Sequence, residues 1–272
     1  MWFFNKKHTI AASGILAGTT DHHSHILPGV DDGVDTMDEA LRILAAYETL
    51  GIKELWLTPH IMEDIPNTPQ KLQARFEELK TAYTGNIRLH LAAEYMIDNH
   101  LHQLLQDCHF EPQGEISLNS PSFKKREYPK GEGDRTPKQD PPHLLPIGKS
   151  SKHILVETSY YNAPMRMNDT LQRLKSSGFI PQLAHPERYM YLDNADYIKL
   201  HSQGIKFQLN LASLAGGYGP AVKKKALWLL SNSLYSVAGT DLHSEESISL
   251  ITKCKLSKQH IEQVERLLHN SI

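Results

Sequence analysis

Residues 21–25 read Asp21-His22-His23-Ser24-His25 and stand at the end of a short predicted strand. Successive side chains of a strand point to opposite faces, so His23 and His25 point to the same side and can bind one metal ion together. His22 points the other way in a regular strand, and we do not expect it to be a ligand. An isolated His-x-His pair is common on protein surfaces, so its meaning depends on what the rest of the chain places beside it.

Short apolar runs and amphipathic helices alternate along the rest of the chain. Thr36 and Glu39 have the spacing of a capping box, and apolar residues recur at three- and four-residue intervals from Met37 to Tyr47. Further strands are predicted at Lys53–Thr58, Ile87–Ala93, His153–Glu157, Phe179–Ala184, Lys206–Asn210 and Ser236–Thr240. Further helices are predicted at Pro69–Tyr83, Asp98–Cys108, Asn168–Ser177, Ala195–Ser202, Pro220–Asn232 and Lys258–His269. This alternation favours an α/β fold of about seven parallel βαβ units, which indicates a closed barrel rather than an open sheet.

The ends of these predicted strands carry histidine or carboxylate, and in a parallel barrel all such ends lie on the face that holds the active site. Asp241 and His243 repeat the spacing of His23 and His25. Imidazole and carboxylate together suit Zn²⁺, Mn²⁺ or iron. Five histidines and three carboxylates exceed the four ligands of one tetrahedral ion, so two or three metals are expected. The candidate ligands are His23, His25, His60, Glu94, Glu157, His185, Asp241 and His243.

Each candidate taken singly has an ordinary explanation, and the argument depends on their conjunction. His60 follows a proline and could be a turn residue, Glu94 or Glu157 could lie beside a helix N-terminus, and His185 could be a core histidine. The other histidines lack such placement and are expected to be structural or solvated. These are His8, His90, His100, His102, His109, His143, His153, His201, His260 and His269.

Arg188 follows His185 by three residues and cannot itself bind a metal ion. Beside a cationic cluster its guanidinium would be repelled unless an anion lay between them, and a phosphate ester is such an anion. The alternative is an ion pair with Glu187 or Asp193. We favour the phosphate interpretation, which makes Arg188 the candidate catalytic and phosphate-binding residue.

Composition excludes several other classes of protein. The 272 residues suffice for one barrel domain, and a net charge of −2 gives no support for a nucleic-acid binder. Cys108 and Cys254 are far apart and neither precedes an arginine-containing phosphate loop, so a disulfide framework and a cysteine phosphatase are both disfavoured. The apolar run after Lys7 is too weak for a good signal peptide and no run could span a membrane, so we expect a cytoplasmic protein.

Two segments fall outside the regular alternation. We predict one domain over residues 1–272, with an N-terminal extension at 1–18. The stretch 119–151 is rich in proline, lysine and glycine and has no hydrophobic period, so we predict a flexible insertion there. It is expected to be a solvated loop, with a partner-binding loop as the alternative.

Residues 21–33 resemble the opening motif of the bacterial tyrosine-protein phosphatases of the polymerase-and-histidinol-phosphatase (PHP) superfamily, which regulate capsular and exopolysaccharide synthesis. The strings Leu-Pro-Gly-x-Asp-Asp-Gly, from Leu27 to Gly33, and His-Pro-Glu-Arg-Tyr, from His185 to Tyr189, are specific to this branch. Leu57-Thr58-Pro59-His60 and Thr240-Asp241-Leu242-His243 match further motifs. The resemblance covers nearly the whole chain from Thr20 onward.

This resemblance implies a distorted (β/α)7 TIM-like barrel of the PHP type with about three divalent metal ions, manganese first and iron or zinc as alternatives. It implies the eight ligands named above, with Arg188 binding the phosphate. The substrate would be phosphotyrosine in a protein, notably a bacterial tyrosine autokinase that controls polysaccharide export. The 119–151 insertion departs from the family pattern, so the resemblance says little about substrate access or protein partners.

Three alternatives remain open at this point. One is a small-molecule phosphatase, for example for histidinol phosphate, which would share the metals and the barrel. Another is a non-catalytic regulator that keeps metals for stability, although such a protein has no need for Arg188. The third is a metal amidohydrolase. Asp31 and Asp32 are candidates for a general acid, with loop capping as the competing role.

Overall fold

In the computed structural model, residues 7–107, 144–150 and 152–272 are described. The strands are β1 (His8–Thr9), β2 (Thr20–Asp21), β3 (Glu54–Leu57), β4 (His60–Ile61), β5 (Arg88–Leu91), β6 (Glu94–Met96), β7 (His153–Glu157), β8 (Ile180–Ala184), β9 (Lys206–Asn210), β10 (Val237–Gly239) and β11 (Lys255–Leu256). The helices are α1 (Ile10–Ser13), α2 (Met37–Leu50), α3 (Pro69–Ala82), α4 (Asn99–Asp107), α5 (Met167–Ser176), α6 (Asn194–Ser202), α7 (Leu211–Ala215), α8 (Pro220–Ser231), α9 (Glu245–Thr252) and α10 (Lys258–His269), with a 3₁₀ turn η1 (Pro186–Arg188). Most of the 119–151 insertion lies outside the described residues.

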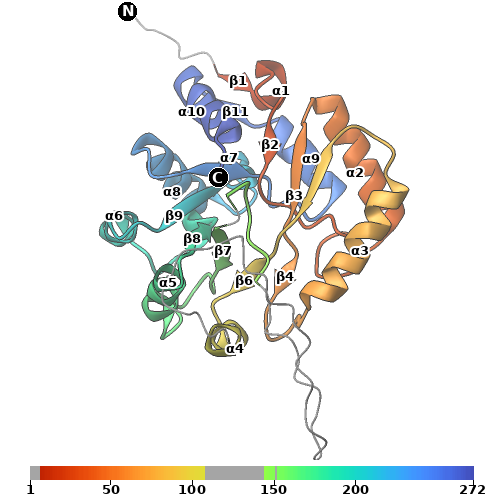
Figure 1. The fold of residues 1–272 in the computed structure, drawn as a ribbon. Coiled ribbons are helices and arrows are strands. Elements are labelled where there is room, and N and C mark those ends of the chain that lie inside the picture. Colours follow the sequence, from red (N-terminus) through yellow and green to blue (C-terminus); the bar gives the residue numbers. More distant parts are fainter. Residues whose placement is uncertain (1–6, 108–143, 151) are drawn as a thin grey trace, which may run out of the picture.

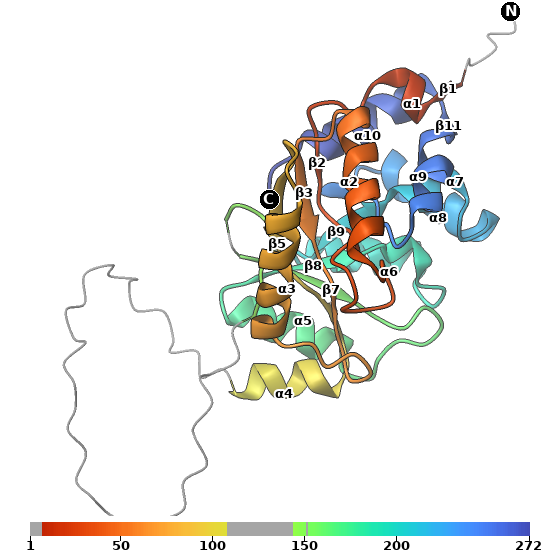
Figure 2. The same ribbon diagram turned by 90° about the vertical axis from the view of Figure 1, so that its right-hand side faces the viewer.

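The sheet is parallel and curled, and helices surround it (Figures 1 and 2). Six strands run in the order β10-β9-β8-β7-β6-β4 and three more in the order β2-β3-β5. Pro59, which has no N–H for the ladder, lies between β3 and β4. Backbone bonds from Ala92 to Leu57 and from Glu94 to Pro59 carry the pairing across the break. The two sheets are therefore successive parts of one curved surface, and a parallel bridge joins Ser24 to Leu242 at its far edges.

The predicted alternation of strands and helices is confirmed. His153–Glu157, Lys206–Asn210 and Lys258–His269 have the predicted bounds. The predicted strand Ile87–Ala93 is shorter in the structure, where β5 ends at Leu91 and a further strand, β6, begins at Glu94. The two-residue strands β1, β4 and β11 and the short helices α1 and α7 were not predicted, since they are too short to show a hydrophobic period.

The helix termini follow the local sequence. The Thr36 hydroxyl accepts the backbone N–H of Glu39, which is one half of the predicted capping box, and Asp193 and Asp196 form a complete box at α6. The main core lies between the sheet and the helices and includes Ile43 and Leu44 of α2. A separate small cluster, Trp56, Ala92, Ile147, Leu155 and Ala184, packs on the other face of the strands. The candidate site is built from side chains on that concave face.

No helix within the described ranges is long and apolar enough to cross a membrane.

Candidate metal centre

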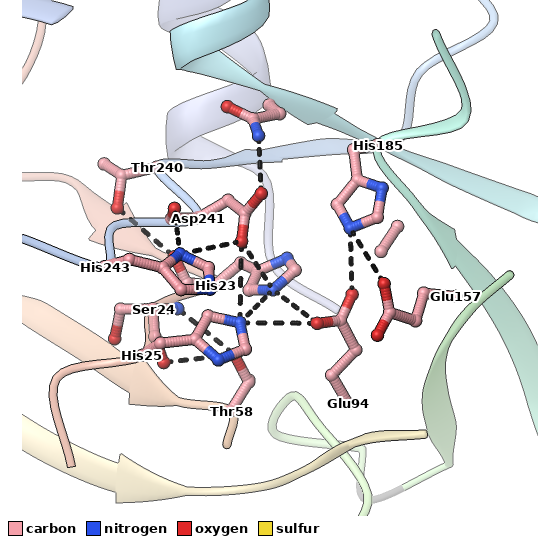
Figure 3. A network of polar contacts seen from close by, with 12 residues as sticks. His23, Ser24, His25, Thr58, Glu94, Glu157, His185, Thr240, Asp241 and His243 are labelled. Atoms are coloured by element: carbon pink, nitrogen blue, oxygen red, sulfur yellow. Dashed lines mark hydrogen bonds and ion pairs between the residues drawn. The ribbon is translucent and has the colours of Figure 1, made fainter. Parts of the chain in front are cut away.

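The structure brings all eight predicted ligands together at one side of the sheet, where His60 and Glu94 begin β4 and β6 and the other six lie at or just after the carboxyl-terminal ends of strands. We call these eight residues with Asp32 the rim cluster, and Figure 3 labels all of them except His60 and Asp32. His23, His25, Glu94, Glu157, His185 and Asp241 are almost completely buried, and His60 nearly so. Their ligand atoms form three overlapping groups, each of which could hold an ion. The groups are His25, Asp32, His60 and His243; His23, His25, Glu94 and Asp241; and His60, Glu94 and Glu157. His185 completes the cluster with its Nε2 atom 3.1 Å from Glu94 Oε1.

Hydrogen bonds fix the tautomers of the first two histidines. Gln208 donates from Nε2 to the His22 carbonyl, so its Oε1 faces His23 Nδ1 at 2.6 Å. Oε1 therefore accepts a hydrogen bond from the N–H at His23 Nδ1. The Asp31 carboxylate likewise accepts from His25 Nδ1 at 2.8 Å. Both Nε2 atoms are then lone-pair acceptors, and they lie only 3.0 Å apart.

Two acceptors at this distance, facing carboxylate oxygens as well, repel one another unless a cation lies between them. Glu94 Oε2 is 3.2 Å from His23 Nε2 and 3.3 Å from His25 Nε2, and Asp241 Oδ1 is 3.4 Å and 3.5 Å from the same two atoms. Neutral imidazoles oriented by a second hydrogen-bonded group and mixed with carboxylates are the usual environment of a bound divalent ion. The residues present therefore fit a metal centre.

The carboxylates of the cluster raise the pKa values of His23 and His60. Burial disfavours a charged imidazole, yet Glu94 and Asp241 raise the pKa of His23 to about 9. Burial also acts against His60, but Asp32, Glu157 and Glu94 raise its pKa to about 12. Cations are thus strongly favoured at this site, as protons in the metal-free protein and as metal ions otherwise.

Asp31 and Asp32 have different roles. Asp31 accepts from the backbone N–H groups of Gly33 and His60 while it orients His25. Asp32 lies 3.4 Å from His60 Nε2 and 3.5 Å from His243 Nε2, in the position of a ligand. Hydrogen bonds from His243 and His60 hold the pKa of Asp32 below its usual range, so it is ionised at neutral pH. Neither aspartate is suited to be a general acid, and the structure gives Asp31 two roles, loop capping and orientation of His25.

The backbone at the rim cluster has close approaches at two glycines and two positive φ angles that the sequence does not predict. A Cβ atom at Gly33 would overlap the backbone of His25, and one at Gly239 would overlap His23, so both glycines allow the ligand strand to approach closely. His185 and Asp241 have positive φ angles of 32° and 52°, which side-chain-bearing residues rarely adopt. Such conformations cluster at functional sites because the surrounding structure enforces them.

Arg188 lies beside the cluster and is held by Asp241 and two tyrosine rings. Its Nη1 donates to Asp241 Oδ2 at 3.0 Å, and its guanidinium carbon lies 4.1 Å and 4.0 Å from the ring centres of Tyr160 and Tyr218. The ion pairs with Glu187 or Asp193 that the sequence left open are not found among the described residues. Glu187 instead accepts from Asn210 and Tyr235, and Asp193 caps α6.

Sequence reasoning missed five residues that shape the site, namely Asp32 as a ligand, Gln208, Asn210, Tyr160 and Tyr218. Gln208 and Asn210 alternate at the end of a predicted strand, which was the available signal. Asn210 Nδ2 donates to Asp241 Oδ2 at 2.7 Å, so two side chains hold the outer oxygen of that carboxylate. Its inner oxygen, Oδ1, is left to face the histidines.

The family model described as capsular polysaccharide synthesis, CpsB/CapC, matches residues 19–113 and 143–268 of the chain. The tyrosine-protein phosphatase YwqE of Bacillus subtilis (strain 168) is 25% identical over 237 residues, which are 86% of this chain and 80% of that protein. The tyrosine-protein phosphatase CpsB of Streptococcus pneumoniae is 24% identical over 235 residues, 84% of each chain. Crystal structures of these two, called unique metal-dependent tyrosine phosphatases, include a chain with a TM-score of 0.66 at 21% identity, over 92% of this chain and 93% of that one.

Proposed function

The chain belongs to the CpsB/CapC family of capsular polysaccharide synthesis proteins, and from this membership we propose that it is a metal-dependent phosphatase acting on phosphotyrosine in proteins. The observation that carries the proposal is the adjacency of two sites. A cluster that favours cations lies directly beside a guanidinium, and Asp241 contacts both. A phosphoryl group is the ligand that both sites can share, because its oxygens accept from arginine and also bind divalent ions.

Each residue of the site has a role in the proposed phosphoryl transfer. His23, His25, His60, Glu94, Glu157, His185, Asp241 and His243, with Asp32, would hold the ions. Ions bound there supply Lewis acidity and activate water at neutral pH. Arg188 binds the phosphoryl oxygens and offsets the charge that develops on them. Burial of the cluster strengthens each of these electrostatic interactions.

The leaving group explains why a general acid is not required. A tyrosine phenolate has a pKa near 10 in water, so it departs more readily than an alkoxide. Asp31 and Asp32 are both held ionised by their neighbours, so neither can act as a proton donor at neutral pH. The site therefore suits an aryl phosphate better than an alkyl one.

The finer assignments are part of the same proposal. We assign three metal ions, manganese first and iron or zinc as alternatives, and a tyrosine autokinase that controls polysaccharide export as the substrate. We assign one domain of the PHP type, a distorted (β/α)7 barrel. The Ser24–Leu242 bridge, which connects the two outer edges of the curled sheet, supports closure. We also assign a cytoplasmic location, which the buried free thiol of Cys254 supports.

The test is phosphate release from a phosphotyrosine peptide, a phosphoserine peptide and histidinol phosphate by protein stripped with chelator and reloaded with manganese. His60→Ala and Arg188→Ala are assayed in parallel, with Glu54→Gln, a buried carboxylate outside the rim cluster that contacts Arg88, as a matched control. We expect release from phosphotyrosine alone, dependent on metal, lost in His60→Ala and reduced to a small residual rate in Arg188→Ala.

Each alternative gives a different result. Release only from histidinol phosphate would keep the metal centre and replace the substrate by a small molecule. Tight metal binding with no turnover of any of the three substrates would reject catalysis and leave a metal-containing regulator.

A further inference from the structure

Arg188 lies in an aromatic slot. Its guanidinium carbon is 4.1 Å from the centre of the Tyr160 ring and 4.0 Å from that of the Tyr218 ring, so two aromatic rings contact the planar group. One edge donates to Asp241. The guanidinium is planar, so two ring contacts and one hydrogen-bonded edge restrict the direction in which its remaining N–H groups point.

The two rings are held in different ways. Tyr160 is fixed by its surroundings, because its ring stacks on Tyr189 with centres 6.3 Å apart and its carbonyl accepts the backbone N–H of Met190. Tyr218 lies in the turn Gly216-Gly217-Tyr218-Gly219 between α7 and α8, and its side chain is more exposed. Its hydroxyl accepts from Asn210 Nδ2 at 3.3 Å.

Asn210 connects this slot to the metal cluster. The same Nδ2 donates to Asp241 Oδ2 at 2.7 Å, and its Oδ1 accepts from the backbone of Ala212, which fixes the amide orientation. The positions of Tyr218, Arg188 and the ligand Asp241 are thereby coupled. A shift of Tyr218 would therefore move the guanidinium relative to Asp241.

We propose that Tyr160 and Tyr218 are positioning residues that hold Arg188 in the orientation in which it receives the phosphoryl group. This inference rests on the proposed function. A ring over a guanidinium adds a cation–π attraction as well as a steric wall, so replacing either ring by an aliphatic side chain loosens Arg188. Phenylalanine preserves the wall and the attraction.

The test compares Tyr160→Leu, Tyr218→Leu and their Phe counterparts in the manganese-loaded protein. We expect each Leu variant to lower kcat/KM for p-nitrophenyl phosphate about 10-fold and to weaken inhibition by inorganic phosphate by a similar factor. Each Phe variant is expected to restore most of both. Tyr161→Leu serves as the control, because this neighbouring tyrosine is 76% exposed and no contact between it and Arg188 is found in the described structure.

The decisive comparison repeats the Leu variants in an Arg188→Gln background. If the rings act through Arg188, they cause no further loss there, whereas a general structural effect would add the same 10-fold factor again. Losses that add, or Leu variants equal to the parent protein, would overturn the inference while the phosphatase activity of the parent stands. A parent protein without turnover would instead remove the proposed function itself.

Discussion

The concave side of the curled sheet carries two clusters of histidine and carboxylate. The rim cluster lies mostly at or just after the carboxyl-terminal ends of strands. The other, which we call the floor cluster, consists of His22, Glu54, Arg88, His90 and Lys149, of which Glu54 and Arg88 begin β3 and β5. His22 and Glu54 are buried, whereas the side chains of Arg88 and Lys149 are 67% and 66% exposed. Both clusters contain the residue types from which a metal site is made.

Fixed cations distinguish the two clusters. Glu54 of the floor is contacted by Arg88 and by Lys149, with Nε of Arg88 3.1 Å and Nζ of Lys149 3.5 Å from Oε1. The rim has a surplus of carboxylates and one arginine at its edge. Burial lowers the pKa of His22 to about 4, whereas the rim carboxylates raise the pKa of His23 to about 9. The adjacent residues His22 and His23 thus differ, because the rim carboxylates outweigh burial at His23 while burial outweighs Glu54 at His22, and only the rim favours a bound cation.

The largest expected effect is the loss of the central rim carboxylate. Glu94 contacts His23, His25, His60 and His185, and Glu94→Gln keeps its shape while removing its charge. We expect kcat/KM on a phosphotyrosine peptide to fall by at least about 10³-fold and the number of bound ions per chain to drop. Elemental analysis and steady-state kinetics measure the two effects. Glu54→Gln is the matched change in the floor, and equal losses in both variants would abolish the distinction between the clusters.

How much of this was predictable can be seen residue by residue. Strand ends and the parallel alternation are local signals, and they were enough to place His23, Glu157 and His185 at a common edge. The role of Gln208 was not predictable, because its contact with His23 spans 185 residues and depends on strand register. The floor cluster was also not predicted. The sequence predicts only a structural or solvated role for His90, and the fold is needed to show that its Nε2 lies 3.6 Å from Glu54 Oε2.

The next largest effect concerns the carboxylate behind a ligand. Asp31 holds the Nδ1 proton of His25, and in Asp31→Asn the amide can turn its NH₂ toward that nitrogen and disfavour the ligand tautomer. We expect metal affinity to weaken about 10- to 100-fold, with activity recovering at high manganese concentration. Titration of metal into stripped protein measures this. Asp35→Asn, an exposed change in the same loop, should leave the affinity within about 2-fold. Activity that stays low at saturating metal would instead place Asp31 in the chemical step.

A third prediction uses pH to separate the clusters in metal-free protein. His22 is neutral in the fold down to about pH 4, while the unfolded chain takes up a proton below about 6.5, so His22 costs stability as the pH falls between these values. At pH 5 this amounts to about 2 kcal/mol relative to pH 7. His22→Gln should remove that part of the pH dependence in urea unfolding.

His23 is expected to show the opposite sign in the same experiment. Its raised pKa gives stability that is present below about pH 6.5 and lost as the pH rises through about 9. The difference between parent protein and His23→Gln should therefore shrink toward high pH. Parallel pH profiles for parent and His22→Gln would show that the floor histidine is not held neutral by burial.

The smallest effect is expected when the floor is made to resemble the rim. Arg88 and Lys149 lower the pKa of His90, as burial does, whereas Glu54 raises it. The double variant Arg88→Gln/Lys149→Gln removes both fixed cations and leaves His90 as an ionisable partner of Glu54. The pKa of His90 should then rise, as measured by NMR titration of the imidazole protons, with activity on phosphotyrosine retained. Lys206→Gln is the control, because Lys206 lowers the pKa of His153 and should shift that histidine instead. If the pKa of His90 does not move, burial alone sets it, and the fixed cations are not what separates the floor from a metal site.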